Sequence, residues 1–170
     1  MNVFYMGEKC LRAVSEPVEA IDDNIRLLVE EMFHTMKKEN GIGLAAPQVG
    51  KNLRLFIALV DNQKYVFINP QIIETSQDVC DIEEGCLSIP KIYEYVTRPS
   101  AVRIQFLDIE GKRKTMEADG LLARVIQHEN DHLNGVLFID RLDPKKKEEL
   151  IKRFEQKKKI RPKVKKRPLR

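Results

Sequence analysis

The chain has 170 residues, of which 42% are hydrophobic and 33% charged, and it contains no tryptophan. This length suits one globular domain, with or without a tail, and excludes two full-sized catalytic domains. Three cysteines do not form a disulfide scaffold, the N-terminus has no signal-peptide pattern, and no apolar stretch approaches the roughly 20 residues that span a bilayer. We therefore expect a cytoplasmic protein that makes no use of a membrane.

The formal net charge of +4 is distributed unevenly along the chain. Residues 145–170 carry 14 basic and 3 acidic side chains, a net of +11, which leaves a net of −7 on residues 1–144. An acidic body with a basic tail predicts that the two parts do different things.

The first predicted helix covers residues 22–40. Six apolar residues between Ile25 and Met36 recur at helical spacing, and Asp22 or Asp23 can cap the start. A strip of small, turn-forming residues follows at 41–50.

The middle of the chain alternates between strands and turns. Residues 83–90 are predicted to be extended and to end at Pro90. Two hairpins are predicted, formed by residues 53–60 with 64–69 and by residues 101–109 with 112–117.

Helical periodicity returns in the last third of the sequence. A second helix is predicted over residues 121–133, and a third begins near Pro144, with later prolines expected to interrupt it after Gln156. Hairpins and helices without a run of βαβ units favour an α+β fold.

The most specific local pattern is His128-Glu129-Asn130-Asp131-His132 on the second helix. Residues four apart share a helix face, so His128 and His132 can bind one metal ion. Glu129 lies roughly 100° round the helix, where it can exchange protons with a water on the metal.

A catalytic metal site needs a third protein ligand. A glutamate from a later helix would have to come from the basic tail, and a histidine six residues after His132 is excluded because residue 138 is phenylalanine. Cysteine remains a strong candidate, since thiolates bind Zn²⁺ and Fe²⁺ tightly. Cys86 looks well placed, while Cys10 and Cys80 read as ordinary thiols but stay open as alternatives.

Three motifs together resemble the peptide deformylase family. Residues 41–48 (GIGLAAPQ), 84–88 (EGCLS) and 127–133 (QHENDHL) have that family's order and spacing, and residues 11–18 resemble its opening. The resemblance covers about residues 3–143. It implies antiparallel β-sheets packed around a central helix that carries the His-Glu-x-x-His motif, with an N-terminal and a C-terminal helix.

The resemblance also implies a function and a metal. Deformylases remove the N-formyl group from the methionine that begins nascent bacterial chains, giving formate and a free amine. The implied ligands are Cys86, His128 and His132 around one divalent ion, with Fe²⁺ as the native metal and Zn²⁺ or Ni²⁺ as substitutes.

The remaining site residues are implied by the same resemblance. Glu129 would carry protons, and the Gln48 side-chain amide and the Leu87 backbone N–H would stabilise the oxyanion. The substrate peptide and its methionine side chain would lie against Ile42, Gly43, Ile82, Gly85, Leu121 and Val125.

Two positions depart from the family pattern. Arg124 stands one turn before His128, where an apolar residue is common, and we expect its charge to turn toward solvent or a carboxylate. Tyr93 replaces a charged or polar residue after the cysteine motif, and both departures bear on substrate preference.

We divide the chain into a catalytic domain at 1–143 and a C-terminal helix with basic tail at 144–170. We expect a monomer whose tail contacts ribosomal RNA. Two alternatives are a zinc peptidase with the same motif and a non-enzymatic RNA-binding protein with a structural metal.

Overall fold

Two antiparallel β-sheets enclose one helix in the computed structural model, which describes the backbone of residues 1–160 and the side chains of residues 1–158. The helices and strands are α1 (Asp23–Lys38), β1 (Gly43–Ala45), β2 (Leu55–Val60), β3 (Gln63–Thr75), β4 (Val79–Cys86), β5 (Ile89–Pro99), β6 (Ala101–Leu107), β7 (Arg113–Asp119), α2 (Gly120–Leu133) and α3 (Pro144–Ile160). Short 3-10 segments occur at η1 (Lys9–Leu11), η2 (Ala46–Val49) and η3 (Phe138–Arg141).

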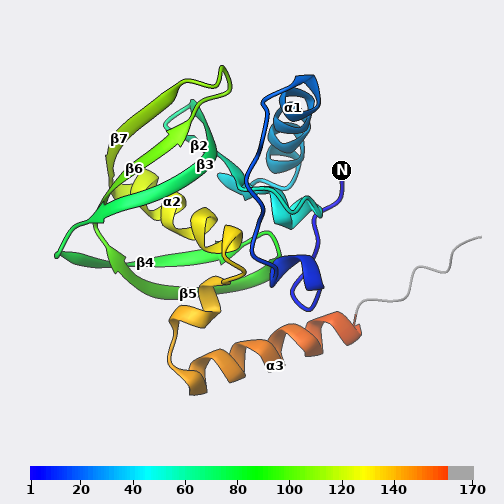
Figure 1. The fold of residues 1–170 in the computed structure, drawn as a ribbon. Coiled ribbons are helices and arrows are strands. Elements are labelled where there is room, and N and C mark those ends of the chain that lie inside the picture. Colours follow the sequence, from blue (N-terminus) through cyan, green and yellow to red (C-terminus); the bar gives the residue numbers. More distant parts are fainter. Residues whose placement is uncertain (161–170) are drawn as a thin grey trace, which may run out of the picture.

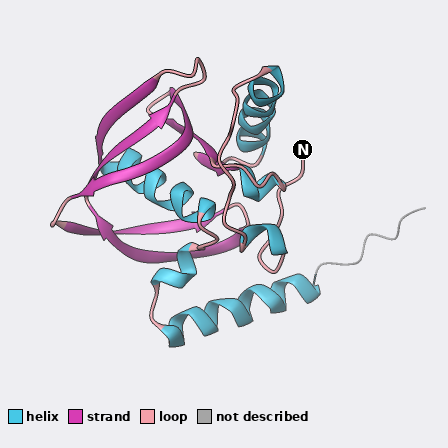
Figure 2. Cartoon of the chain, in the orientation of Figure 1, coloured by secondary structure: helices cyan, strands magenta, loops and turns pink. Residues whose placement is uncertain are grey.

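The larger sheet has the strand order β1-β2-β3-β6-β7, and β4 and β5 form the smaller one. Helix α2 lies between the two sheets, with α1 beside the larger sheet and α3 beneath β5 (Figure 1). Figure 2 shows the same layers by type of secondary structure. The expected α+β fold, with antiparallel sheets around a central helix, is confirmed.

Strand β2 is apolar on both faces because a helix covers each face of the larger sheet. Leu55 and Ile57 belong to the core cluster formed with α1, while Phe56 and Ala58 belong to the cluster formed with α2. The turn into β3 uses Asp61 and Asn62 at φ values of 52° and 62°, the left-handed conformation that two-residue hairpins require. This core fixes α2 in place.

The segment 83–90 corrects a prediction. It is a hairpin, in which Cys86 ends β4, Leu87 and Ser88 make the turn, and Ile89 begins β5. Pro90 therefore lies inside a strand that it was expected to end. The pairing register shifts just there, which relieves the proline of the ladder hydrogen bond that it cannot donate.

Helix boundaries also differ slightly from prediction. Helix α1 ends at Lys38 rather than Asn40, and α3 continues past Gln156 to Ile160. The first proline beyond Gln156 is Pro162, so the chain can stay helical for four more residues. The rest of the predicted basic tail, residues 161–170, lies outside the described residues.

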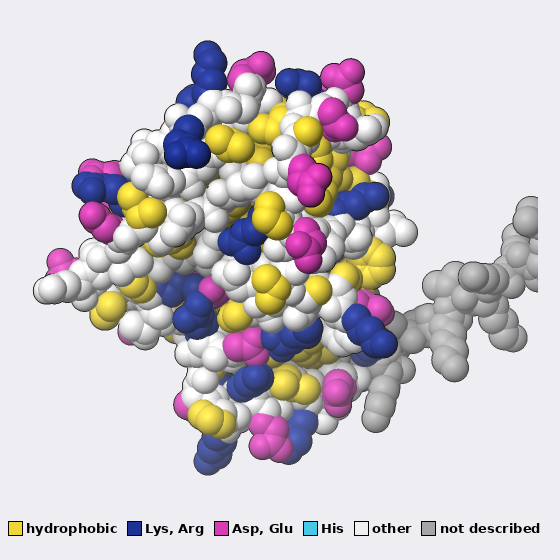
Figure 3. Space-filling view, viewed as in Figure 1, with side chains coloured by type: hydrophobic (Ala, Val, Ile, Leu, Met, Phe, Trp, Pro, Cys, Tyr) yellow, Lys and Arg dark blue, Asp and Glu magenta, His cyan; other side chains and the backbone are white. Residues whose placement is uncertain are grey.

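Helix α3 is fastened to β5 along its length. Leu150 and Phe154 are buried in one core cluster with strand β5. Lys146 pairs with Glu94 at 3.1 Å, and Lys157 donates a hydrogen bond of 2.9 Å to the Lys91 carbonyl. On the face shown in Figure 3, basic and acidic side chains are intermixed over this helix. Among the described helices, none has the length and hydropathy needed to cross a bilayer.

Candidate metal centre and active site

Three predicted metal ligands converge at one point inside the molecule. Cys86, His128 and His132 each offer a ligand atom, and these atoms lie within 4.8 Å of one another. Cys86 Sγ is 3.3 Å from His132 Nε2. The hairpin supplies the thiol and α2 supplies both imidazoles, as helical spacing predicted for the histidines. Cys10 and Cys80 belong to no such group within the part of the chain that the structure describes.

The donor set fits a divalent transition metal. One sulfur and two imidazole nitrogens suit Fe²⁺ or Zn²⁺, and three protein ligands leave a coordination position free for chemistry. His128 Nδ1 lies 2.8 Å from a Glu84 carboxylate oxygen, which leaves Nε2 as the ligand atom. His132 Nδ1 is buried without a hydrogen-bond partner among the described residues.

Burial and neighbouring groups shift the pKa values of the two histidines in opposite directions. Burial opposes a charge on His128, but hydrogen bonds to Cys86 and Glu84 outweigh it and raise its pKa well above 6.5. Burial, reinforced by the charge of His128, lowers the pKa of His132 well below 6.5. Burial acts to raise the pKa of Glu84, yet hydrogen bonds from His128 and Arg98 hold it well below 4.5. Glu84 is therefore a fixed carboxylate.

Glu129 is a buried titratable group next to His128 on α2. Burial, together with the Glu84 charge and against the His128 charge, raises the pKa of Glu129 to about 7. Its Oε2 atom has no hydrogen-bond partner among the described residues. A Cβ added at Gly43 would collide with Glu129 Oε1 and lie 2.9 Å from Val125 Cγ1. Glu129 therefore faces β1 and can gain or lose a proton near neutral pH.

A buried ionic network, which the sequence reasoning missed, supports the ligands. Glu84 binds Arg98 at 2.6 Å and Arg124 at 2.8 Å, while Asp131 binds Arg98 at 2.8 Å and Arg141 at 2.6 Å. Arg124 thus turns toward a carboxylate, one of the two expected outcomes. A sequence signal for Arg98 existed, because it shares strand alternation with the buried Val96.

Gln48 is held by contacts on both ends of its amide. It is 1% exposed, and its Oε1 atom accepts a 2.9 Å hydrogen bond from the Ala45 N–H within its own loop. Its Nε2 atom donates to Ser88 Oγ at 3.1 Å and points at Cys86 Sγ at 3.5 Å. The loop bond therefore presents the amide N–H groups to the metal side of the cavity.

A cavity of about 630 Å³ opens beside two of the ligands, Cys86 and His128. Its wall includes Gln48, Leu87 and Glu129. The predicted substrate-contacting residues all line it: Ile42, Gly43, Ile82, Gly85, Leu121 and Val125. A Cβ at Gly85 would collide with the ring of Tyr93, which stands at the cavity rim and is 60% exposed.

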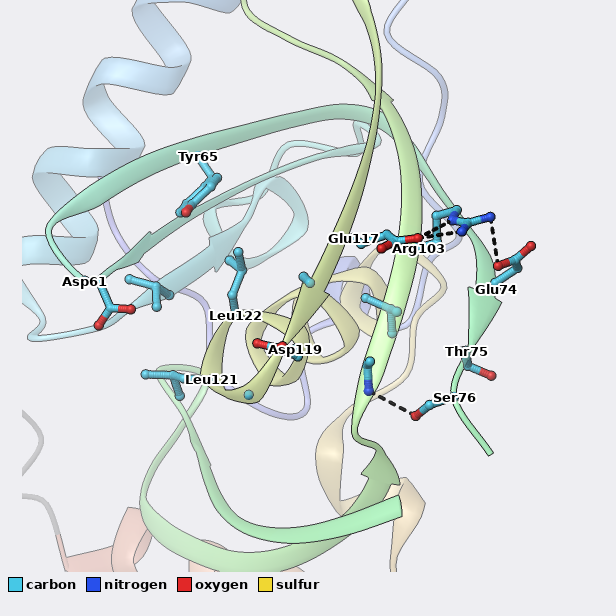
Figure 4. A pocket seen from close by; sticks show the side chains of 15 residues that line it. Asp61, Tyr65, Glu74, Thr75, Ser76, Arg103, Glu117, Asp119, Leu121 and Leu122 are labelled. Carbon is cyan, nitrogen blue, oxygen red and sulfur yellow. Dashed lines mark hydrogen bonds and ion pairs between the residues drawn. The ribbon is translucent and has the colours of Figure 1, made fainter. Parts of the chain in front are cut away.

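A second cavity, of about 760 Å³, lies beside the start of α2 (Figure 4) and shares Leu121 with the first. It is lined mainly by β3, β6 and β7, and Arg103 there pairs with both Glu74 and Glu117. Its lining contains no cysteine or histidine. Candidate metal ligands therefore border the first cavity and not the second.

Known proteins resemble this chain over most of its length. The sequence profile of the family described as polypeptide deformylase matches residues 1–148. A peptide deformylase of Treponema pallidum is 50% identical over 154 residues, covering 91% of this chain and 95% of the relative. A crystal structure of a peptide deformylase from Synechococcus elongatus in complex with actinonin has a TM-score of 0.86 and 43% identity, covering 91% of this chain and 85% of that one. The Ehrlichia chaffeensis enzyme in complex with actinonin has a TM-score of 0.89 and 39% identity, covering 95% and 98%.

Proposed function

The chain belongs to the polypeptide deformylase family, and on that premise we propose which of its residues remove the N-formyl group from nascent peptides. It is a hydrolase, and the reaction releases formate and frees the amino terminus. The comparisons give no support to a zinc peptidase or to a non-enzymatic RNA-binding protein. The observation that carries the assignment of roles is the convergence of Cys86, His128 and His132, with the buried Glu129 next to His128 on α2.

In this proposal Cys86, His128 and His132 hold one divalent ion, with Fe²⁺ as the native metal and Zn²⁺ or Ni²⁺ able to replace it. The ion supplies Lewis acidity, which makes water a nucleophile at neutral pH. The sulfur and imidazole donor set and the family membership support this choice of metals.

Glu129 is proposed to carry the proton. It accepts a proton from the attacking water and delivers it to the amide nitrogen, because an amine anion is too poor a leaving group. Burial suits it to both steps, since its pKa of about 7 lets either protonation state exist at neutral pH.

Gln48 and Leu87 are proposed to stabilise the oxyanion that forms on the formyl oxygen. The Gln48 side chain is fixed before substrate arrives, because its Oε1 atom is bound to the Ala45 N–H. Leu87 stands in the tight turn directly after Cys86, where its backbone N–H is close to the ligand. Donors held in place in this way need no reorganisation during the reaction.

The substrate peptide is proposed to add to the larger sheet along β1. This strand ends the order β1-β2-β3-β6-β7, so one of its edges is available for pairing. Ile42 and Gly43 would pair with the peptide backbone. The methionine side chain would fill the part of the cavity lined by Ile82, Gly85, Leu121 and Val125.

The cellular context is also a proposal. Residues 1–143 would act as the catalytic domain of a cytoplasmic monomer, and residues 144–170 would bring it to ribosomal RNA. The net charge of +11 on residues 145–170 supports this, because phosphate backbones attract clustered Lys and Arg.

A formate-release assay with a formyl-Met peptide tests the proposed function. We expect formate and one bound ion per chain, and no turnover of the same peptide carrying an acetyl group or a free amine. Cys86→Ser should lose the ion and the activity, whereas Cys10→Ser, at another half-buried cysteine, should keep both. Wild-type metal content and rate in Cys86→Ser would contradict the ligand assignment.

A further inference from the structure

Arg124 is a buried cation close to the ligand set. It lies one helical turn before His128 on α2, and only 4% of its side chain is exposed. Arginine is almost never buried to this extent unless it is paired. The proposed mechanism assigns it no role.

The Arg124 guanidinium joins three separate segments. Its Nη1 atom donates to Glu84 Oε1 at 2.8 Å and to the Val96 carbonyl at 2.7 Å, and its Nη2 atom donates to the Cys80 carbonyl at 2.7 Å. These acceptors belong to β4 and β5, so the side chain ties α2 to both strands of the smaller sheet. A planar fork of donors can hold such an arrangement, whereas a lysine ammonium on a flexible stem cannot.

Arg124 also completes the hydrogen bonding of Glu84. That carboxylate receives two hydrogen bonds from Arg98, at 2.6 and 3.1 Å, one from Arg124, and one from His128 Nδ1. An ionised carboxylate has about four acceptor positions, so all of them are used. With its plane fixed in this way, Glu84 can orient the His128 ring in one direction only.

Arg124 is the second buried arginine of the network, beside two buried carboxylates. Arg98 and Arg124 face Glu84 and Asp131, and all four are largely buried. The third cation of the network, Arg141, is 49% exposed. Without Arg124, the buried part of the network would hold two carboxylates and one guanidinium.

We propose that Arg124 is a positioning residue, which acts through Glu84 to hold His128 in the orientation that binds the metal. The inference rests on the proposed function, because it takes His128 as a ligand. It adds that the charged residue in a position expected to be apolar serves the metal site, although it also forms part of the cavity wall.

Two effects of removing Arg124 have opposite signs, which makes the inference testable. A cation near the metal repels it, so loss of charge alone would tighten metal binding. Loss of positioning would weaken it, and removal of partners that orient a ligand typically costs 10–100-fold in metal affinity. Arg124→Met removes both the charge and the planar guanidinium donors, while Arg124→Lys keeps the charge and loses the guanidinium donors.

The experiment measures the dissociation constant of Zn²⁺ by chelator competition and the visible absorption spectrum of the Co²⁺-loaded protein. We expect both variants to bind Zn²⁺ 10–100-fold more weakly than the wild type, with a changed Co²⁺ spectrum. Arg103→Met is the matched control, because Arg103 also pairs with two carboxylates but is 39% exposed and lies in the larger sheet. It should leave both readouts unchanged.

Tighter Zn²⁺ binding by Arg124→Met, or an unchanged Zn²⁺ constant and Co²⁺ spectrum in both variants, would overturn the positioning role. A lower melting temperature alone would show that Arg124 only stabilises the fold. If Arg124→Met does not fold, Arg124→Lys decides. Wild-type metal content and formate release are measured alongside, so the proposed function stands or falls independently of these variants.

Discussion

At the scale of single residues, Glu129 is the proposed proton carrier. We expect Glu129→Gln to keep its metal and lose turnover by on the order of 10²–10⁴-fold, because the amide cannot carry the proton. Formate release and metal content measured on the same sample check this. A variant that keeps its ion and its full rate would remove Glu129 from the mechanism.

Gly43 occupies a position where any Cβ would meet Glu129 Oε1 and lie 2.9 Å from Val125 Cγ1. We expect Gly43→Ala to lower kcat by on the order of 10²-fold, because a displacement of about 1 Å in a catalytic group has this effect. Formate-release kinetics and thermal unfolding measure the two consequences separately.

Gly41→Ala is the control for Gly43→Ala. A Cβ at Gly41 would lie 2.8 Å from Leu87 Cδ1, the end of a flexible side chain that can move aside, and 3.3 Å from Met36 Cγ. Its effect on kcat should be much smaller. Equal losses in both variants would mean that the contact with Glu129 is unimportant.

Contacts between residues that are close in the sequence could be predicted. Contacts between residues that only the fold brings together could not. The spacing of His128 and His132 on a helix is enough to suggest a metal site. The joining of Arg98 to Glu84 depends on the pairing of β4 with β5, which no local pattern encodes. The partners of Arg124 were unpredictable for the same reason.

At the scale of elements, α3 is more firmly attached than a charged C-terminal helix suggests. Phe154 is 7% exposed and belongs to a core cluster with β5 and η3. We expect Phe154→Ala to lower the free energy of unfolding by about 3–5 kcal/mol, the usual cost of truncating a buried aromatic side chain. Denaturant titration measures it, with Leu27→Ala as control because Leu27 is 55% exposed on α1. Equal stability of the two variants would contradict the packing of α3.

Asp140 joins three elements by charge. It accepts hydrogen bonds from Arg12 and the Leu137 N–H, and it pairs with Lys147 at 2.7 Å. Burial acts to raise its pKa, but the bonds from Arg12 and Lys147 outweigh this and lower it from 3.8 to about 2. The ionised form is therefore the one that stabilises the fold.

A carboxyl group whose pKa is lower in the folded state stabilises the fold at pH values above its pKa in the unfolded chain. This stabilisation is lost as the pH falls through the pKa of the folded state. The Asp140 contribution is thus complete above about pH 4 and is lost toward pH 2. It amounts to at most about 2 kcal/mol, because solvent screens the partly exposed Arg12 and Lys147. We expect Asp140→Asn to be less stable by this amount at pH 7 and to approach the wild type near pH 2, as measured by urea unfolding. Glu110→Gln, at an exposed carboxylate in a turn, should be neutral. An equal stability difference between Asp140→Asn and the wild type at pH 7 and near pH 2 would contradict the stabilising role of the ionised carboxylate.

The boundaries of helices and strands were predicted with unequal success. Helical periodicity located α1 and α2 to within about two residues, because each has one apolar face against the sheet. The hairpin at Cys86 was missed because Pro90 normally marks the end of a strand. Only the irregular pairing of β4 with β5 allows a proline there.

At the scale of the whole molecule, the charge is divided between an acidic body and a basic end. Truncation after Ile160 removes six basic residues and no acidic one, and it keeps the buried side chains of α3. We expect formyl-peptide turnover to be unchanged and ribosome association to weaken and to lose part of its salt dependence. Co-sedimentation with ribosomes at several salt concentrations measures this. Unchanged association would show that residues 161–170 play no part in docking.

Lys157 and Lys91 connect the far end of α3 to the rim of the substrate cavity, since Lys157 binds the Lys91 carbonyl and Lys91 lines that cavity. A partner that bound α3, displaced Lys157 and thereby moved Lys91 would alter the free energy of filling the cavity. Such coupling is reciprocal for binding equilibria. The factor by which a partner on α3 changes the affinity for peptide equals the factor by which a bound peptide changes the affinity for that partner. Binding to the ribosome and binding of peptide in the cavity would then be coupled, so that each changes the affinity for the other.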